Sequence, residues 1–337
     1  MRFLHFLEGL RNPVCDFLFS LITHIGEETV FLAVAILFFW CINKREGYYI
    51  LITGLIGTLV NQFLKMLCRI PRPWERGTGL TYVESAFEEA KGYSFPSGHT
   101  QNTAGTFGVI GAYSKKKWLR ITTVVIIVLV GFSRMYLGVH TPADVLVSLA
   151  VAAVLVVGFY PLFTDERRFH RAMPYIIAAS AILAIGFAVY VSLIDPSEVL
   201  AHNYKSSRDN AATLLGCFFG LCVVYPLDRF VIKFETGGVW YSQLIKLVLG
   251  FGLVMGVKAG LSAPLEALVG IFTDTPRLIA RAIRYFLVVL TAGVFWPLSF
   301  GFFARLRISF LDNFTDWLKS KLTKTQHAPA STEEKGN

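Results

Sequence analysis

Three short polar clusters interrupt an otherwise apolar chain, and their side chains are of the types that bind and transfer a phosphoryl group. The clusters read KMLCRIPRP, PSGH and SRMYLGVHTPAD. Guanidinium groups match phosphate oxygens in a bidentate geometry, so the cations in these clusters predict a phosphate-bearing ligand. The candidate residues are, in chain order, Lys65, Arg72, Ser97, Gly98, His99, Arg134, His140 and Asp144.

The second cluster precedes a weakly hydrophobic stretch that contains four glycines. Ser97 can cap a helix that begins at Gly98, which leaves free N–H groups and the positive end of the helix dipole facing a ligand. Gly98 has no side chain, so a phosphoryl group could approach the backbone closely. A Pro-Ser-Gly sequence on its own predicts only a turn. Beside the other two clusters it predicts a phosphate-binding turn.

The two histidines of the clusters are candidates for covalent and acid–base catalysis. His140 and Asp144 are four residues apart, so on a helix they share a face and Asp144 can hold one ring nitrogen. The other nitrogen of His140 is then a nucleophile, and His99 is the candidate general acid. No Asp, His or Glu grouping has metal-ligand spacing, so we expect neither metal nor cofactor, and the three cations would stabilise transition-state charge.

The elements that position these residues are apolar helices. Of the 337 residues, 54% are hydrophobic and only 16% are charged, whereas soluble domains average roughly a quarter charged residues. A spanning helix needs about 20 apolar residues. Nine segments approach this length: 28–43, 47–67, 98–114, 119–138, 142–163, 172–194, 210–228, 242–262 and 278–303. We therefore expect an all-α, polytopic transmembrane helical bundle of about nine spans, with the three clusters on one face.

Composition also suggests a division of the chain. Amphipathic N-terminal helices, broken by Pro13, precede a buried core that carries the three clusters, and the third span is polar enough to lie inside the bundle. The segments we expect are an interfacial segment at 1–27, the core with the three clusters at 28–170, additional transmembrane helices of unknown role at 171–310 and a polar cytoplasmic tail at 311–337.

The net charge of +9 does not indicate nucleic-acid binding, because the basic residues form short runs between apolar segments. Such runs are typical of loops held at the lipid surface. The densest ones, at 44–45, 115–120 and 167–171, fall on one side with the basic residues near the C-terminus. This asymmetry predicts a cytoplasmic C-terminus and polar clusters on the extracytoplasmic side. The five cysteines include no CxxC, so neither a disulfide framework nor a metal site is indicated.

The spacing of the three clusters resembles the three-part signature of the type 2 phosphatidic acid phosphatase superfamily. The signature reads Lys, six residues, Arg-Pro; then Pro-Ser-Gly-His; then Ser-Arg, five residues, His, three residues, Asp. That superfamily includes membrane lipid phosphatases, undecaprenyl diphosphate phosphatases and glucose-6-phosphatase. The resemblance covers roughly residues 45–160. It implies phosphate binding by Lys65, Arg72, Ser97, Gly98 and Arg134, a phosphohistidine at His140, leaving-group protonation by His99 and orientation of His140 by Asp144.

We therefore expect a metal-independent membrane phosphatase that acts on undecaprenyl diphosphate, a phosphatidate-type lipid or a sphingoid phosphate. Its partners would be this substrate and membrane lipids, with no nucleic acid. We place it as a multi-pass protein in a cell membrane, preferably the bacterial inner membrane, with the site facing the extracytoplasmic side. A lipid-linked phosphotransferase and a lipid transporter or scramblase stay open as alternatives. Three glutamates before the second cluster (Glu84, Glu88 and Glu89) are expected to form a solvated face.

Overall fold

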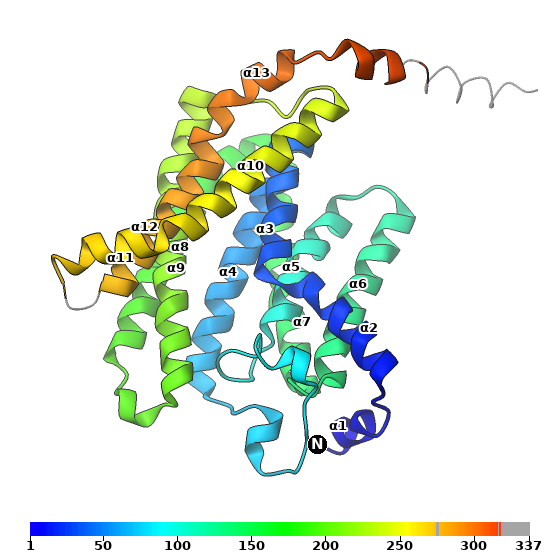
Figure 1. The fold of residues 1–337 in the computed structure, drawn as a ribbon, viewed down its shortest axis with the longest axis vertical. Helices are drawn as coiled ribbons and strands as arrows, with labels where there is room; N and C mark the ends of the chain where they lie inside the picture. Colours follow the sequence, from blue (N-terminus) through cyan, green and yellow to red (C-terminus); the bar gives the residue numbers. More distant parts are fainter. Residues whose placement is uncertain (274–275, 316, 318–337) are drawn as a thin grey trace, which may run out of the picture.

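The computed structural model describes residues 1–273, 276–315 and 317, and these residues form helices and connecting loops without a β-strand (Figure 1). The all-α fold expected from the sequence is confirmed. The first seven α-helices are α1 (Arg2–Glu8), α2 (Pro13–Thr23), α3 (Glu28–Leu37), α4 (Lys44–Cys68), α5 (Gly98–Tyr113), α6 (Lys117–Tyr136) and α7 (Pro142–Thr164). The remainder are α8 (Glu166–Leu193), α9 (Ala201–Leu227), α10 (Trp240–Gly260), α11 (Ser262–Gly270), α12 (Pro276–Leu290) and α13 (Phe300–Arg305).

Short 3₁₀ and π turns join or extend these helices. The 3₁₀ turns are His24–Gly26, Pro73–Arg76, Glu84–Ala86, Pro196–Glu198 and Pro297–Ser299. The π turns are Phe38–Ile42, Asp228–Ile232 and Thr291–Phe295.

The helices make this a multi-pass membrane protein. Within the described residues, seven helical segments are long and apolar enough to cross a bilayer, and α2 with α3, bent by 50°, would form an eighth. The one remaining expected span, at 98–114, corresponds to α5. This helix has 16 residues and is therefore shorter than the roughly 20 that a span needs. The count of about nine thus holds approximately. Most of the expected polar tail, residues 316 and 318–337, lies outside the described residues.

The short helix α5 lies inside the bundle, as its polar and glycine-rich sequence predicts. It packs against α4, α6 and α7, which surround it in Figure 1. Several of its polar side chains are buried, namely Thr100, Gln101, Thr103 and Thr106. A helix with this composition is unsuited to contact with lipid, and small side chains allow its neighbours to approach closely. The bundle therefore holds the N-terminus of α5 among three other helices.

The N-terminal helices lie at the same end of the bundle as the loop that joins α4 to α5 (Figure 1). Pro13, where we expected a break, is the first residue of α2. Glu8 accepts a 2.8 Å hydrogen bond from the backbone N–H of Thr81, and Arg11 donates to the carbonyl oxygen of Thr81. Partial burial raises the pKa of Glu8, but hydrogen bonds from Thr81 and His5 outweigh it and lower that pKa overall. These contacts fix α1 to the loop.

The second half of the chain packs mainly on itself. Helix α9 lies between α8 and α12, and α10 crosses α12 at an angle (Figure 1). The contact between α9 and α12 requires a glycine, because a Cβ on Gly216 would lie 2.2 Å from the carbonyl oxygen of Ala282. Small residues at such crossings allow backbones to touch in a membrane bundle. The division of the chain at residue 170 stays a prediction.

Replacing Gly216 by Ala should destabilise the protein, because its Cβ would also lie 2.9 Å from the backbone nitrogen of Phe286. Overpacking of this kind costs about 1–3 kcal/mol. Thermal unfolding in detergent measures the effect. The matched control is Gly252→Ala on α10, where a Cβ would meet no atom within 4 Å. Equal melting temperatures for the two variants would contradict this account of the α9–α12 contact.

Candidate active site

The three polar clusters meet at the end of the bundle where α4 and α6 end and α5 and α7 begin (Figure 1). All the charged or hydroxyl-bearing candidates except His99 are less than 5% exposed, namely Lys65, Arg72, Ser97, Arg134, His140 and Asp144. Charged side chains in a membrane bundle are costly unless paired or functional. Their burial together indicates a site and not a set of headgroup anchors.

His140 and Asp144 are paired, although His140 lies before the helix and does not share a helical face with Asp144. Helix α7 begins at Pro142, so His140 precedes the cap residue Thr141. A capping box supplies the geometry instead: Asp144 Oδ2 accepts a 2.7 Å hydrogen bond from the Thr141 N–H and a 2.6 Å bond from Ser94 Oγ. The same oxygen lies 3.4 Å from Nδ1 of His140. Asp144 is thereby fixed beside the ring.

The other ring nitrogen of His140 faces Arg72. Nε2 lies 3.0 Å from NH1 of Arg72. A guanidinium can only donate, so Nε2 is the acceptor and the proton resides on Nδ1, toward Asp144. Arg72 is held in place by further bonds to the carbonyl oxygens of Lys91, Gly92 and Val139. The arrangement presents a lone pair on Nε2 in a cationic environment.

Two further cations complete the site. Lys65 donates to the carbonyl oxygen of Tyr93. Arg134 donates through NH1 to Thr23 Oγ1 at 2.6 Å. Its Nε and NH2 are buried and bond to none of the described residues. Buried donors without an acceptor cost about 1–3 kcal/mol each, so these two nitrogens are suited to an anionic ligand.

The turn before α5 adds backbone donors. Ser97 is the cap residue expected from the sequence, and its Oγ accepts from Thr100 Oγ1 at 2.9 Å and from the Thr100 N–H at 3.4 Å. Its own N–H donates to the Asp144 carbonyl at 3.1 Å, which joins the second cluster to the third. A Cβ on Gly98 would meet no atom within 4 Å. The helix N-terminus at Gly98 is therefore open to a ligand.

His99 lies at the same helix N-terminus, and its Nε2 is 3.0 Å from Oε2 of Glu89. The expectation that Glu84, Glu88 and Glu89 form a solvated face is therefore wrong for Glu89, which is half-buried. Nothing in the sequence distinguishes Glu89 from Glu88, its neighbour.

Sequence reasoning also missed Thr23 and Ser94. Thr23 belongs to α2, in the segment expected to be only interfacial, yet it bonds to Arg134. Ser94 lies in the loop just before the second cluster and bonds to Asp144. Neither position carries a pattern that could have identified it. Both contacts depend on how the chain folds back over the site.

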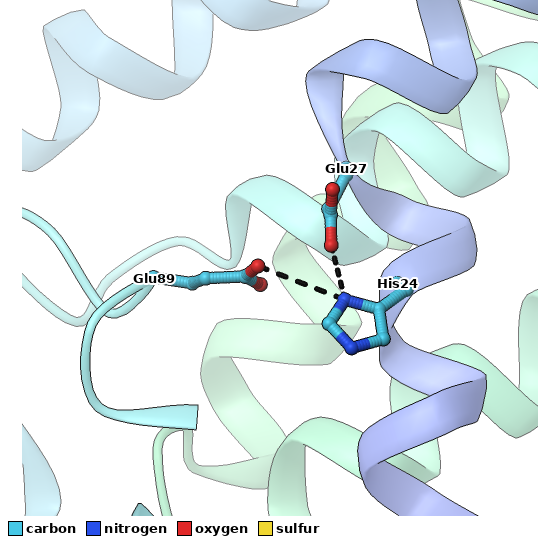
Figure 2. Close-up of side chains that lie close together, drawn as sticks. All are labelled: His24, Glu27 and Glu89. Carbon is cyan, nitrogen blue, oxygen red and sulfur yellow. Dashed lines mark hydrogen bonds and ion pairs between the residues drawn. The ribbon is translucent and has the colours of Figure 1, made fainter. Parts of the chain in front are cut away.

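Over the described part of the chain, one group of side chains could hold a metal ion: His24, Glu27 and Glu89, whose ligand atoms lie within 4.8 Å of one another (Figure 2). These residues belong to the α2–α3 turn and to the loop before α5, outside the three clusters. The eight candidate residues do not form such a group.

Two stretches of the chain match known families. Residues 45–168, which include every candidate residue, match the PAP2 superfamily. Residues 212–308 match the transmembrane extension of PAP2 superfamily phosphatases. The crystal structure of Aquifex aeolicus LpxE is similar at 21% identity, with a TM-score of 0.39, over 48% of this chain and 93% of that one.

The relatives are lipid phosphatases. Phosphatidylglycerophosphatase B of Bacillus subtilis is 30% identical over 43% of this chain and 74% of its own length. The undecaprenyl-diphosphatase BcrC of the same organism is 31% identical over 47% of this chain and 79% of its own. Mouse sphingosine-1-phosphate phosphatase 1 is 24% identical over 75% of this chain and 61% of its own. The chain thus belongs to the PAP2 superfamily and is a membrane phosphatase, a hydrolase of phosphate esters.

Proposed function

We propose that this enzyme hydrolyses a lipid phosphate or diphosphate without a metal, through a phosphohistidine at His140. The observation that carries the proposal is the environment of His140. Its Nε2 accepts from Arg72 while its Nδ1 faces Asp144 at 3.4 Å. A histidine held in this tautomer is a nucleophile poised beside the cations that an incoming phosphoryl group needs.

In the first step the bound phosphoryl group takes over the hydrogen bond that Arg72 makes to Nε2 of His140, and the freed lone pair of Nε2 attacks phosphorus. The N–P bond forms as the bond from phosphorus to the leaving oxygen breaks, and His99 gives that oxygen a proton. In the second step water attacks phosphorus, His99 accepts a proton from the water, and the N–P bond breaks to release phosphate. Both histidines return to their starting states.

The remaining candidate residues bind the phosphoryl group and stabilise the charge that develops on its oxygens. Arg134 offers two buried nitrogens without partners among the described residues, and Lys65 and Arg72 add positive charge from α4 and the loop after it. Ser97 and Gly98 present the N-terminus of α5, which favours an anion. Preorganised donors in a site that excludes water are typically the largest single contribution to such a reaction.

A lipid substrate fits the position of the site at the end of a membrane bundle, because a headgroup can enter while the acyl or prenyl chain stays in the bilayer. Undecaprenyl diphosphate, phosphatidate-type lipids and sphingoid phosphates all meet this condition. The basic runs begin α4, α6 and α8, at the end of the bundle opposite the site (Figure 1). Such runs favour the cytoplasmic side. We therefore propose that the site faces the extracytoplasmic side. The relatives in Bacillus subtilis support a bacterial inner membrane as the location.

The test is phosphate release by detergent-purified enzyme in EDTA, from undecaprenyl diphosphate, phosphatidate and sphingosine phosphate. Radiolabelled substrate with an acid or alkaline quench then reports the intermediate, since a phosphohistidine is acid-labile and alkali-stable. We expect release from at least one lipid and an alkali-stable labelled protein. An enzyme that loses all activity in EDTA, or an acid-stable label, would overturn the mechanism. Label passing to an added alcohol in preference to water would identify a phosphotransferase.

A further inference from the structure

Glu89 lies on the loop between α4 and α5 and contacts His99 directly. Its Oε2 is 3.0 Å from Nε2 of His99, and the side chains of His99 and Glu89 are only 15% and 29% exposed. A carboxylate can only accept, so Nε2 of His99 carries the proton in this bond. Because both groups can be charged, the bond belongs to the stronger, charge-assisted class whenever the ring is protonated.

The second oxygen of Glu89 faces the turn between α2 and α3 (Figure 2). Oε1 lies 3.7 Å from Nδ1 of His24, and the same nitrogen bonds to Glu27. The turn comes this close because Gly26 has no side chain: a Cβ there would lie 2.8 Å from the Cβ of His99. Glu89 is therefore held between His99 on α5 and His24 on the N-terminal turn.

We propose that Glu89 is a positioning residue for the general acid His99, an inference that rests on the proposed function. With Nε2–H held by Glu89, the ring is oriented and Nδ1 is the nitrogen that gives its proton to the leaving oxygen as the P–O bond breaks. In the second step Nδ1 takes a proton from water. Glu89 stays a carboxylate throughout and exchanges no proton.

The charges around the site explain why a carboxylate belongs at this position. Lys65, Arg72 and Arg134 are buried at the end of the bundle where α5 begins with Gly98 and His99. Like charges repel in such a setting, so a protonated imidazole needs an opposite charge next to it. Glu89 supplies that charge from the side of the ring remote from the leaving oxygen.

The experiment compares two leaving groups in the first turnover by rapid quench. Octyl phosphate releases an alkoxide, which needs a proton to leave. The second substrate, p-nitrophenyl phosphate, releases p-nitrophenolate, which leaves without one. General acid catalysis contributes about 10²–10⁴-fold. We expect Glu89→Gln to slow the burst of octanol release by about 10- to 100-fold, within that contribution. The rate of p-nitrophenol release in the first turnover should change by less than about threefold, because this leaving group needs little general acid catalysis.

The matched control is Glu88→Gln, which changes the exposed neighbouring residue and should leave both bursts unchanged. A change in folding or substrate binding would slow both substrates equally, so equal losses in Glu89→Gln would overturn the proposal. His24→Gln tests whether His24 helps to hold Glu89, and it should slow the octanol burst less than Glu89→Gln does. An unchanged octanol burst in His24→Gln would show that His24 does not help to hold Glu89.

Two further arms separate this inference from its premises. His99→Gln should show the same dependence on leaving group, more strongly. If it does and Glu89→Gln does not, the inference is wrong and the proposed function stands. If His99→Gln slows both substrates equally, His99 is not the general acid.

A metal ion held by the residues of Figure 2 is the remaining outcome. If EDTA slows the wild-type octanol burst but not that of Glu89→Gln, Glu89 is a metal ligand and positions nothing.

Discussion

His140→Ala should abolish turnover while leaving the protein folded. The imidazole provides the nucleophile, and alanine leaves nothing at that position that can bond to phosphorus. Loss of a catalytic nucleophile costs about 10⁴-fold or more in kcat. The ring is only 2% exposed but bonds mainly to other site residues, so the fold should tolerate its removal. Phosphate release under saturating substrate, together with an alkaline-quench assay for labelled protein, measures both consequences.

The control for this variant is His202→Ala, which removes an exposed histidine from α9 and should retain full activity. The activity of Asp144→Asn should lie between those of the two variants, because the nucleophile remains but the carboxylate that stabilises the ring as it becomes positively charged is lost. A His140→Ala enzyme that still forms an alkali-stable phosphoprotein would show that another residue carries the phosphoryl group.

Arg134→Lys should lower kcat by about 10²–10³-fold, the usual cost of losing a preorganised donor to transition-state charge. Lysine keeps the positive charge but cannot present Nε and NH2 together to two phosphoryl oxygens. Those two nitrogens have no partner among the described residues, whereas NH1 bonds to Thr23. The loss should therefore appear in catalysis and in inhibition by orthovanadate, which mimics five-coordinate phosphorus, more than in thermal stability.

Arg120→Lys is the matched control, because Arg120 lies at the other end of the same helix and is exposed. It should leave both kcat and vanadate inhibition unchanged. If Arg134→Lys kept wild-type inhibition by vanadate, Arg134 would have a structural role and the phosphate would be bound by the other cations.

Much of this site could be predicted from sequence because the signal is chemical. Lys65, Arg134 and Asp144 are charges in apolar helices, where they are rare unless functional. The helical hairpins bring them to one end of the bundle regardless of detailed packing. The all-α fold followed from apolar runs of the length that a bilayer requires.

What could not be predicted depended on loops and on distant contacts. Helix α7 begins at Pro142, where the expected span begins, but His140 lies before it, so a capping box at Thr141 and not a shared helical face places Asp144 beside His140. Glu89 and Glu88 are indistinguishable in sequence, and only the path of the loop brings one of them to His99. Thr23 reaches Arg134 from a helix more than a hundred residues earlier in the chain. Local patterns carry no information about such pairs.

The loop before α5 has a thermodynamic consequence. Within a few residues it contacts each of the three clusters: Gly92 and Tyr93 accept from the cations of the first, Glu89 bonds to the histidine of the second and Ser94 bonds to the carboxylate of the third. Residues that share a network do not contribute independently to its free energy. The effects of substitutions in this loop on the free energy of unfolding should therefore be strongly non-additive. The first substitution should remove most of the coupling, and a second one should then cost less than it does alone.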